Sequence, residues 1–280
     1  MAEDAVLPNR PLLVLEPTQG WASLDLANVW AHRELLYFLT WRDITLRYKQ
    51  TALGITWAVI QPLFPMIIFA LFFGRLGHMP SDGVPYAAFT YAGLLSWTYF
   101  ANAVSTSAAS VVGSSSLVTK VYFPRMIIPG AAVLAALLDF FIGFGVMAVL
   151  LIWFQVPLRS SLAMLPLLIA LETAFALAVG MFFAALTVKY RDVRHALPFL
   201  IQVWMFVTPI IFPSSIVPPR WRMLLALNPL LGIVENFRAA MFGLPFHWGE
   251  LTVSAVLAAA TLVYSAYSFR RLERTFADTI

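Results

Sequence analysis

Cysteine and charged residues are scarce in this sequence. It contains no cysteine, which excludes disulfides, thiolate metal ligands and cysteine nucleophiles. Only 11% of its 280 residues are charged and 61% are hydrophobic, whereas an ordinary soluble domain is about 25% charged and about 45–50% apolar. Because a soluble protein needs charged side chains to cover its surface, this composition predicts an integral membrane protein.

Motifs for nucleotide hydrolysis, acyl transfer and metal binding are also missing. No glycine-rich loop ends in Gly-Lys-Ser/Thr, and no Gly-x-Ser-x-Gly nucleophile motif occurs. The histidines fall in four separate regions without the spacing of metal ligands. We therefore expect no catalytic residue, no metal site and no bound cofactor in this chain.

Long apolar blocks predict six transmembrane helices, since a span needs about 20 mostly apolar residues. The blocks are residues 55–73, 86–112, 129–156, 163–188, 196–212 and 251–269. The fifth is short and is interrupted by Gln202, Thr208 and Pro209, so we expect it to be tilted or broken. The predicted fold class is an all-α integral membrane domain over residues 51–274, between a tail at 1–30, an interface helix at 31–50 and a tail at 275–280.

The positions of Lys and Arg predict the orientation. If six spans alternate from a cytoplasmic N-terminus, 13 of the 18 basic residues lie inside and 5 outside. Basic residues are retained on the cytoplasmic side during insertion, so we expect both tails in the cytoplasm. The net charge of +4 is thus a topology signal and does not indicate nucleic acid as a partner.

Residues 31–50 predict an amphipathic helix beside the first span. Tyr37, Trp41, Ile44 and Tyr48 recur on one helical face, and the basic residues lie largely elsewhere around the helix. A basic, aromatic-rich amphipathic helix is expected to lie in the membrane interface. A simple membrane anchor is the alternative.

Residues 213–248 are long for a loop and yet rich in apolar residues. Non-helical backbone at membrane depth must be buried in protein or line a water-filled cavity. We expect two short re-entrant helices between spans five and six, hinged at Asn228-Pro229 and entering from the outer face. An external amphipathic hairpin resting on lipid headgroups is the alternative.

Two acids, Asp139 and Glu172, fall within predicted spans three and four. An intramembrane carboxylate is costly unless it is paired, hydrated or protonated, so both are functional candidates. Hydrogen bonding between helices, or contact with an aqueous pathway, is the alternative to proton coupling. Aromatic rings, which can stack on sugars, also lie deep in the spans, although core or lipid-facing positions are the alternative: Trp57, Phe64, Phe69, Trp204 and Phe206.

Four stretches of the sequence carry a family resemblance. They are WRDITLRYKQTALG at residues 41–54, followed by Trp57 and Gln61-Pro62; KVYFPR at 120–125; KYRDVRH at 189–195; and NPL at 228–230, with Glu235 and Arg238. Together and in this order they resemble permease subunits of type-2 ABC (ABC-2) exporters for polysaccharides and polyol phosphates, such as O-antigen, capsule and teichoic acid. The resemblance runs from about residue 31 to residue 274.

The resemblance implies a partnership. Two copies of such a permease pair in the inner membrane of a bacterium, and two separate ABC ATPase subunits dock below them and hold the ATP and Mg. The expected substrate is a polysaccharide or glycolipid, carried among membrane lipid and lipid-linked in the leading interpretation.

The resemblance also implies roles for individual residues. Contacts with the ATPase are expected from the interface helix, a coupling helix at 116–125 and a third cytoplasmic loop: Arg42, Asp43, Arg47, Tyr48, Lys49, Lys120, Tyr122, Phe123, Arg125, Arg191 and Asp192. A substrate channel is expected along Trp57, Gln61, Phe64, Trp204 and Phe206. An outer gate is expected at Asn228, Pro229, Glu235 and Arg238.

Three other functions compete with this one. An ABC-2 permease for a drug or small lipid would share most of these features. A membrane-embedded enzyme of glycolipid metabolism would need clustered acids or histidines at one membrane face, and the sequence has no such cluster. A proton-coupled secondary transporter typically has an internal repeat, and none is convincing here.

Overall fold

The computed structural model describes residues 26–49, 54–157, 159–273 and 276, and every structural statement below concerns these residues. They form helices and connecting segments without a β-strand. Most of the predicted N-terminal tail and, except for Phe276, the predicted C-terminal tail lie outside the described residues.

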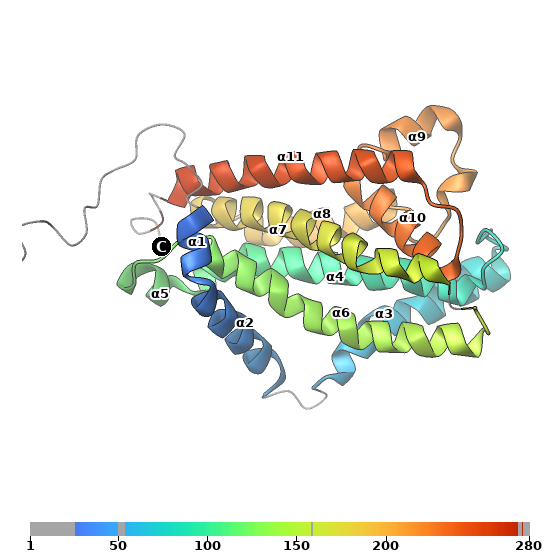
Figure 1. Cartoon of the computed structure of the whole chain (residues 1–280), viewed down its shortest axis with the longest axis horizontal. Helices are drawn as coiled ribbons and strands as arrows, with labels where there is room; N and C mark the ends of the chain where they lie inside the picture. The colour runs from blue at the N-terminus through green and yellow to red at the C-terminus, as the bar shows by residue number, and fades with distance from the viewer. Residues whose placement is uncertain (1–25, 50–53, 158, 274–275, 277–280) are drawn as a thin grey trace, which may run out of the picture.

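Five helices run along the long axis of the molecule (Figure 1). They are α4 (Tyr86–Gly113), α6 (Ile127–Trp153), α7 (Leu165–Lys189), α8 (Val193–Val207) and α11 (Trp248–Glu273). The central helix is α4, which packs on α3 (Thr56–Phe69), α6, α7 and α10 (Pro229–Phe242). One end of the bundle, the α5 end, holds α1 (Leu26–Ala31) and α5 (Ser115–Lys120); the other, the α10 end, holds α9 (Pro219–Leu225) and α10.

Four helical stretches are long and apolar enough to cross a membrane: Thr56–Leu76, Ile127–Trp153, Ser160–Lys189 and Trp248–Glu273. They coincide with the first, third, fourth and sixth predicted spans, and they make this a multi-pass membrane protein. The second predicted span is α4, which is long enough but carries Ser, Thr and Asn side chains along its length. The fifth is α8, a shorter apolar helix. A count of six crossings therefore stays a prediction.

Proline occurs near two irregular points in these helices, and it explains the second of them. Pro62 and Pro65 lie inside α3, where each removes a backbone N–H donor, and α3 continues as a π-helix over Ala70–Leu76. At the other irregular point, α8 ends at Val207 and Thr208 has extended backbone angles. A residue before proline is disfavoured in helical conformation, so Pro209 accounts for this early end.

The predicted interface helix is α2 (Arg33–Tyr48), which lies obliquely against α6 (Figure 1). Leu36 and Leu39 face the protein, and Leu39 is buried. Tyr37 and Trp41 are 64% and 59% exposed. The helix therefore has a protein-facing side and an aromatic side that is free to meet lipid.

Buried side chains form two hydrophobic clusters. The larger one fills the bundle around α4 and includes Phe100, Phe140 and Phe237. The second, here called the end cluster, gathers side chains at the α5 end from α2, α4, α5, α6, α7, α11 and the segments after α5 and α11. They include Leu39, Val111, Val118, Phe123, Ile127, Val188, Phe269 and Phe276. The end cluster joins the predicted interface helix and coupling segment to the ends of the long helices.

Candidate functional site

The side chain of Asp139 bonds α2 to the middle of α6. Its carboxylate accepts hydrogen bonds from the Arg47 guanidinium and the Tyr48 hydroxyl, and it forms an ion pair with Arg47. Asp139 comes twelve residues after the first residue of α6, or about 18 Å along a helix axis. We call Arg47, Tyr48 and Asp139 the α2–α6 latch. Two residues predicted to contact an ATPase thus point toward α6.

The other predicted contact residues of α2 lie on its accessible side. Arg42 donates to the carboxylate of its neighbour Asp43, with an Nη2–Oδ1 distance of 2.8 Å, and Arg42 and Lys49 are exposed. Exposed ion pairs contribute little to stability. These three residues are therefore accessible to a partner at little cost to the fold.

The predicted coupling segment is a short helix followed by an extended stretch. Helix α5 ends at Lys120, which is exposed. Tyr122 is 75% exposed, whereas the next residue, Phe123, is 4% exposed and belongs to the end cluster. Arg125 is held by Glu273 of α11. Of the four predicted contact residues in this segment, Lys120 and Tyr122 are the two that project outward.

The third predicted contact lies in the turn between α7 and α8. Arg191 and Asp192 are both exposed there. The preceding Lys189 Nζ lies 5.1 Å from the centre of the Tyr190 ring, a distance typical of a cation–π contact. This turn presents charged side chains to the surroundings.

The predicted channel residues of α3 share one open face. Trp57 and Phe64 are 49% and 62% exposed, and Gln61 between them is also exposed. The Gln61 Oε1 accepts a hydrogen bond of 3.0 Å from Asn102 Nδ2 of α4. A polar pair flanked by two aromatic rings matches the chemistry of a sugar, which has hydroxyl groups and apolar C–H faces.

The two predicted channel residues of α8 face different ways. The Trp204 ring packs inward, 5.2 Å from the ring centre of Phe100 and 5.9 Å from that of Phe175. Its indole N–H donates to Asn228 Oδ1 at 3.1 Å. Phe206 is 59% exposed. Trp204 is therefore an internal anchor, and only Phe206 is open to a second chain, lipid or substrate.

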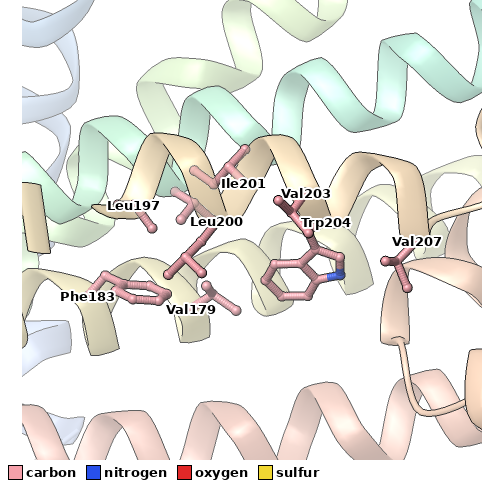
Figure 2. A pocket seen from close by; sticks show the side chains of 9 residues that line it. Val179, Phe183, Leu197, Leu200, Ile201, Val203, Trp204 and Val207 are labelled. Atoms are coloured by element: carbon pink, nitrogen blue, oxygen red, sulfur yellow. The ribbon is translucent and has the colours of Figure 1, made fainter. Parts of the chain in front are cut away.

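Beside Trp204 lies a cavity of about 360 Å³ between α4, α7 and α8. Figure 2 shows Val179 and Phe183 of α7 opposite Leu200 and Trp204 of α8. Its other lining residues are hydrophobic, and the Trp204 N–H is already bonded to Asn228. The cavity therefore offers no free hydrogen-bonding side chain to a sugar hydroxyl.

Asn228 and Pro229 begin α10 and tie it to α8. The Asn228 side chain accepts a hydrogen bond from the Leu230 N–H and so caps the helix. It also donates to Thr208 Oγ1 at 2.9 Å. Pro229 stands in the first turn, where a missing N–H costs nothing. At the predicted hinge, the first turn of α10 is thus bonded to the end of α8.

Arg238 is the most interconnected buried side chain of the predicted gate. It is 1% exposed and donates to the carbonyl oxygens of Phe89, Pro209 and Ile210 at 3.2, 2.7 and 2.6 Å. Its Nη1 lies 3.6 Å from Glu235 Oε1. Glu235 in turn accepts a 3.0 Å hydrogen bond from the Ser214 N–H. One buried ion pair thus joins α4, α10 and the segment after α8.

Glu172 is fully buried between α7 and α4. Its Oε1 accepts a hydrogen bond of 2.7 Å from Ser96 Oγ, and no partner for Oε2 occurs within the described part of the chain. Like Asp139, Glu172 bonds one helix to another. These contacts favour interhelical bonding for both intramembrane acids.

Two residues that matter to these sites were missed at the sequence level. Gly93 of α4 leaves room for Arg238, because a Cβ there would collide with the guanidinium. Glu273, at the end of α11, holds the segment of Tyr122. An isolated Gly in an apolar helix and an acid near the end of a chain are both common, so neither carries a signal in one sequence.

Comparison with known proteins gives a consistent result. The model of the ABC-2 type transporter family matches residues 34–242. An O-antigen export system permease protein, RfbA, of Myxococcus xanthus is 27% identical over 257 residues, covering 90% of this chain and 98% of that protein. RfbA of Klebsiella pneumoniae is 25% identical, covering 88% and 95%. The polysialic acid transport protein KpsM of Escherichia coli is 24% identical, covering 79% and 86%.

Proposed function

Because this chain belongs to the ABC-2 type transporter family, we propose that it is the permease subunit of an ATP-driven exporter of a bacterial polysaccharide such as O-antigen or capsule. The observation that carries this proposal is similarity over nearly the whole length of two O-antigen export permeases. Like the relatives named above, which are transport proteins, the chain is a transport permease. It is not an enzyme. A lipid-linked polysaccharide is the proposed substrate.

We propose six membrane crossings with both termini in the cytoplasm of the inner membrane. The positions of basic residues support this orientation. Val118, Val188 and Phe269 meet in the end cluster, and each lies one or two residues from a basic residue, namely Lys120, Lys189 and Arg270. The α5 end is thus the basic end, which the insertion rule assigns to the cytoplasm.

We propose that two ABC ATPase subunits bind at the α5 end and hold the ATP and Mg. Tyr122 and Lys120 project from this end, and Arg191 and Asp192 are exposed in the turn between α7 and α8. ATP binding must favour one transporter conformation through differential contacts. The α2–α6 latch and the end cluster would carry such a difference from the surface into the long helices.

A second copy of the chain would complete the channel. The exposed faces of α3 and α8 bear aromatic side chains, including Trp57, Phe64 and Phe206. Lipid would cover these faces in a single chain, whereas in a homodimer the faces of the two copies would cover each other. We propose that the α3 face, with Gln61 and Asn102, lines the polysaccharide path, and that α10 closes it at the outer side as a re-entrant gate.

Reconstitution in proteoliposomes tests the proposed function. The permease is purified together with its ATPase, and transport of a lipid-linked polysaccharide is compared with that of the same lipid without glycan. We expect ATP-dependent transport of the glycan-bearing lipid and little of the bare lipid. Equal transport of both would indicate a small-lipid permease, and transport without the ATPase would exclude an ABC mechanism.

Tyr122→Ala is expected to reduce export roughly tenfold or more, which is the size of effect expected when an interface loses one hot-spot residue. Folded protein should accumulate normally. The fold is expected to tolerate the change because the side chain is 75% exposed. Trp153→Ala is the matched control, since Trp153 is 78% exposed at the opposite end of the bundle. Co-purified ATPase and polysaccharide export are the two measurements. Equal export by both variants would refute the assigned contact.

A further inference from the structure

We infer that Glu273 is a positioning residue that fastens the ATPase-contacting segment 121–125 to the last long helix, an inference that rests on the proposed function. The Glu273 carboxylate Oε1 accepts a hydrogen bond of 3.0 Å from the Arg125 backbone N–H. The Arg125 Nη1 donates to the Glu273 backbone carbonyl at 2.7 Å. We call this two-bond contact the Arg125–Glu273 clamp.

The clamp orients a segment that packing holds on one side only. Phe123 is buried in the end cluster on one side of the segment, whereas Val121 and Tyr122 are 52% and 75% exposed. A cavity of about 230 Å³ borders the clamp and is lined in part by Tyr122, Arg125 and Glu273. Because the segment lies beside open space, directional hydrogen bonds decide the direction in which Tyr122 points.

Glu273 is itself held firmly. The rings of Phe269 and Phe276, on either side of it in the sequence, meet with their centres 5.3 Å apart. Both rings are buried in the end cluster. Glu273 therefore has a fixed position at the end of α11. Its carboxylate, as a fixed acceptor, can orient the backbone N–H of Arg125.

The clamp also connects the segment to the opposite end of the molecule. Helix α11 has 26 residues, a length of about 39 Å, and packs on α7 and α10. Its contact with α10 is close: a Cβ on Gly232 would lie 2.5 Å from the backbone oxygen of Glu250. A shift of the segment would thus reach α10 through one continuous helix (Figure 1).

Two substitutions separate this role from others. Glu273→Gln keeps an oxygen that accepts from the Arg125 N–H, and Glu273→Ala removes it. In the full complex with the ATPase, we expect Glu273→Ala to lower export about tenfold, as for the loss of one hydrogen bond. ATP hydrolysis and co-purified ATPase should stay near wild type. Glu273→Gln and the exposed control Glu34→Ala should export normally.

A second measurement uses the absence of native cysteine. A nitroxide label on Lys120→Cys reports the mobility of the segment in purified protein. We expect faster label motion in the Glu273→Ala background and unchanged motion with Glu273→Gln. If Glu273→Ala does not accumulate, Glu273→Asp, whose carboxylate is one methylene shorter, replaces it with the same expectation.

Several outcomes would overturn the inference. Normal export and normal label motion in the Glu273→Ala variant would do so. Equal losses of export in the Ala and Gln variants would also do so, because the charge of Glu273 rather than its acceptor oxygen would then matter. Failure of the wild-type complex to export polysaccharide would instead refute the proposed function. Normal wild-type export with an unaffected Glu273→Ala variant would refute only the role of the clamp.

Discussion

Arg238→Leu is expected to prevent folded permease from accumulating in the membrane. The substitution leaves the carbonyls of Pro209 and Ile210 without their donor and Glu235 without its cation, all in a region with almost no exposure. Removing one partner of a buried ion pair costs about 3–5 kcal/mol, and total stabilities are only about 5–15 kcal/mol. The amount of monodisperse protein after detergent extraction measures the effect.

Arg222→Leu is the matched control for this prediction. Arg222 also donates to two backbone carbonyls, those of Val217 and Ser215 at 2.9 and 2.8 Å, but it is exposed. Water can replace its hydrogen bonds, so we expect a change within about 0.5 kcal/mol. If the Arg238→Leu variant accumulated to the same level as the Arg222→Leu variant, the claim that Arg238 is needed to stabilise the α10 end would be wrong.

Gly93→Ala tests the same buried site from the opposite helix. The added Cβ would collide with the Arg238 guanidinium, which cannot move without breaking its bonds to backbone carbonyls. We expect a loss of about 1–3 kcal/mol, as for an overpacked core, seen as a lower thermal unfolding temperature in detergent. Gly113→Ala, where nothing lies within 4 Å of the added Cβ, should show no such loss.

Arg47→Ala is expected to destabilise the protein by about 3 kcal/mol, as for a half-buried ion pair that loses one partner. The Arg47 and Asp139 side chains are 27% and 14% exposed, so water compensates only in part, and Tyr48 remains as a single donor to the carboxylate. Thermal unfolding in detergent measures this loss, and export should fall with it because α2 is no longer bonded to α6.

The double variant Arg47→Leu/Asp139→Leu distinguishes the effect of the ion pair from the effects that each residue has alone. It leaves no unpaired charge, so most of the lost stability should return, whereas export should stay low. Losses that simply add in the double variant would contradict the latch. Arg42→Ala is the control, since Arg42 is exposed and, among the described residues, forms an ion pair with its neighbour Asp43. Its loss should change stability by about 0.5 kcal/mol or less.

The helices themselves could be predicted well from the sequence, because apolar runs of this length leave few alternatives to a helix. The predicted span at 86–112 is α4 at Tyr86–Gly113. Two short helices lie in the stretch 213–248, as expected: α9 and α10, and α10 begins at Asn228-Pro229. Local chemistry suffices here, since Asn caps a helix and Pro favours its first turn.

The partners of the candidate residues could not be predicted in the same way. Arg47 was predicted to contact an ATPase and Asp139 to be an intramembrane acid, and their pairing joins residues 92 positions apart. Trp204 and Phe206 look equivalent in the sequence, yet one packs inward and the other is 59% exposed. Two positions along a helix differ by about 200°, and only the neighbouring helices decide which direction is inside.

The amino-acid sequence alone determined that this chain is a helical membrane protein, because scarce charges and long apolar runs are properties of composition and local order. Tertiary structure decided which polar groups meet: Arg47 with Asp139, Arg238 with Glu235, and the Arg125 backbone N–H with Glu273. In an apolar bundle a buried polar group without a partner is costly, so pairing is strongly favoured. The identity of that partner depends on helix packing, which brings together residues that are distant in sequence.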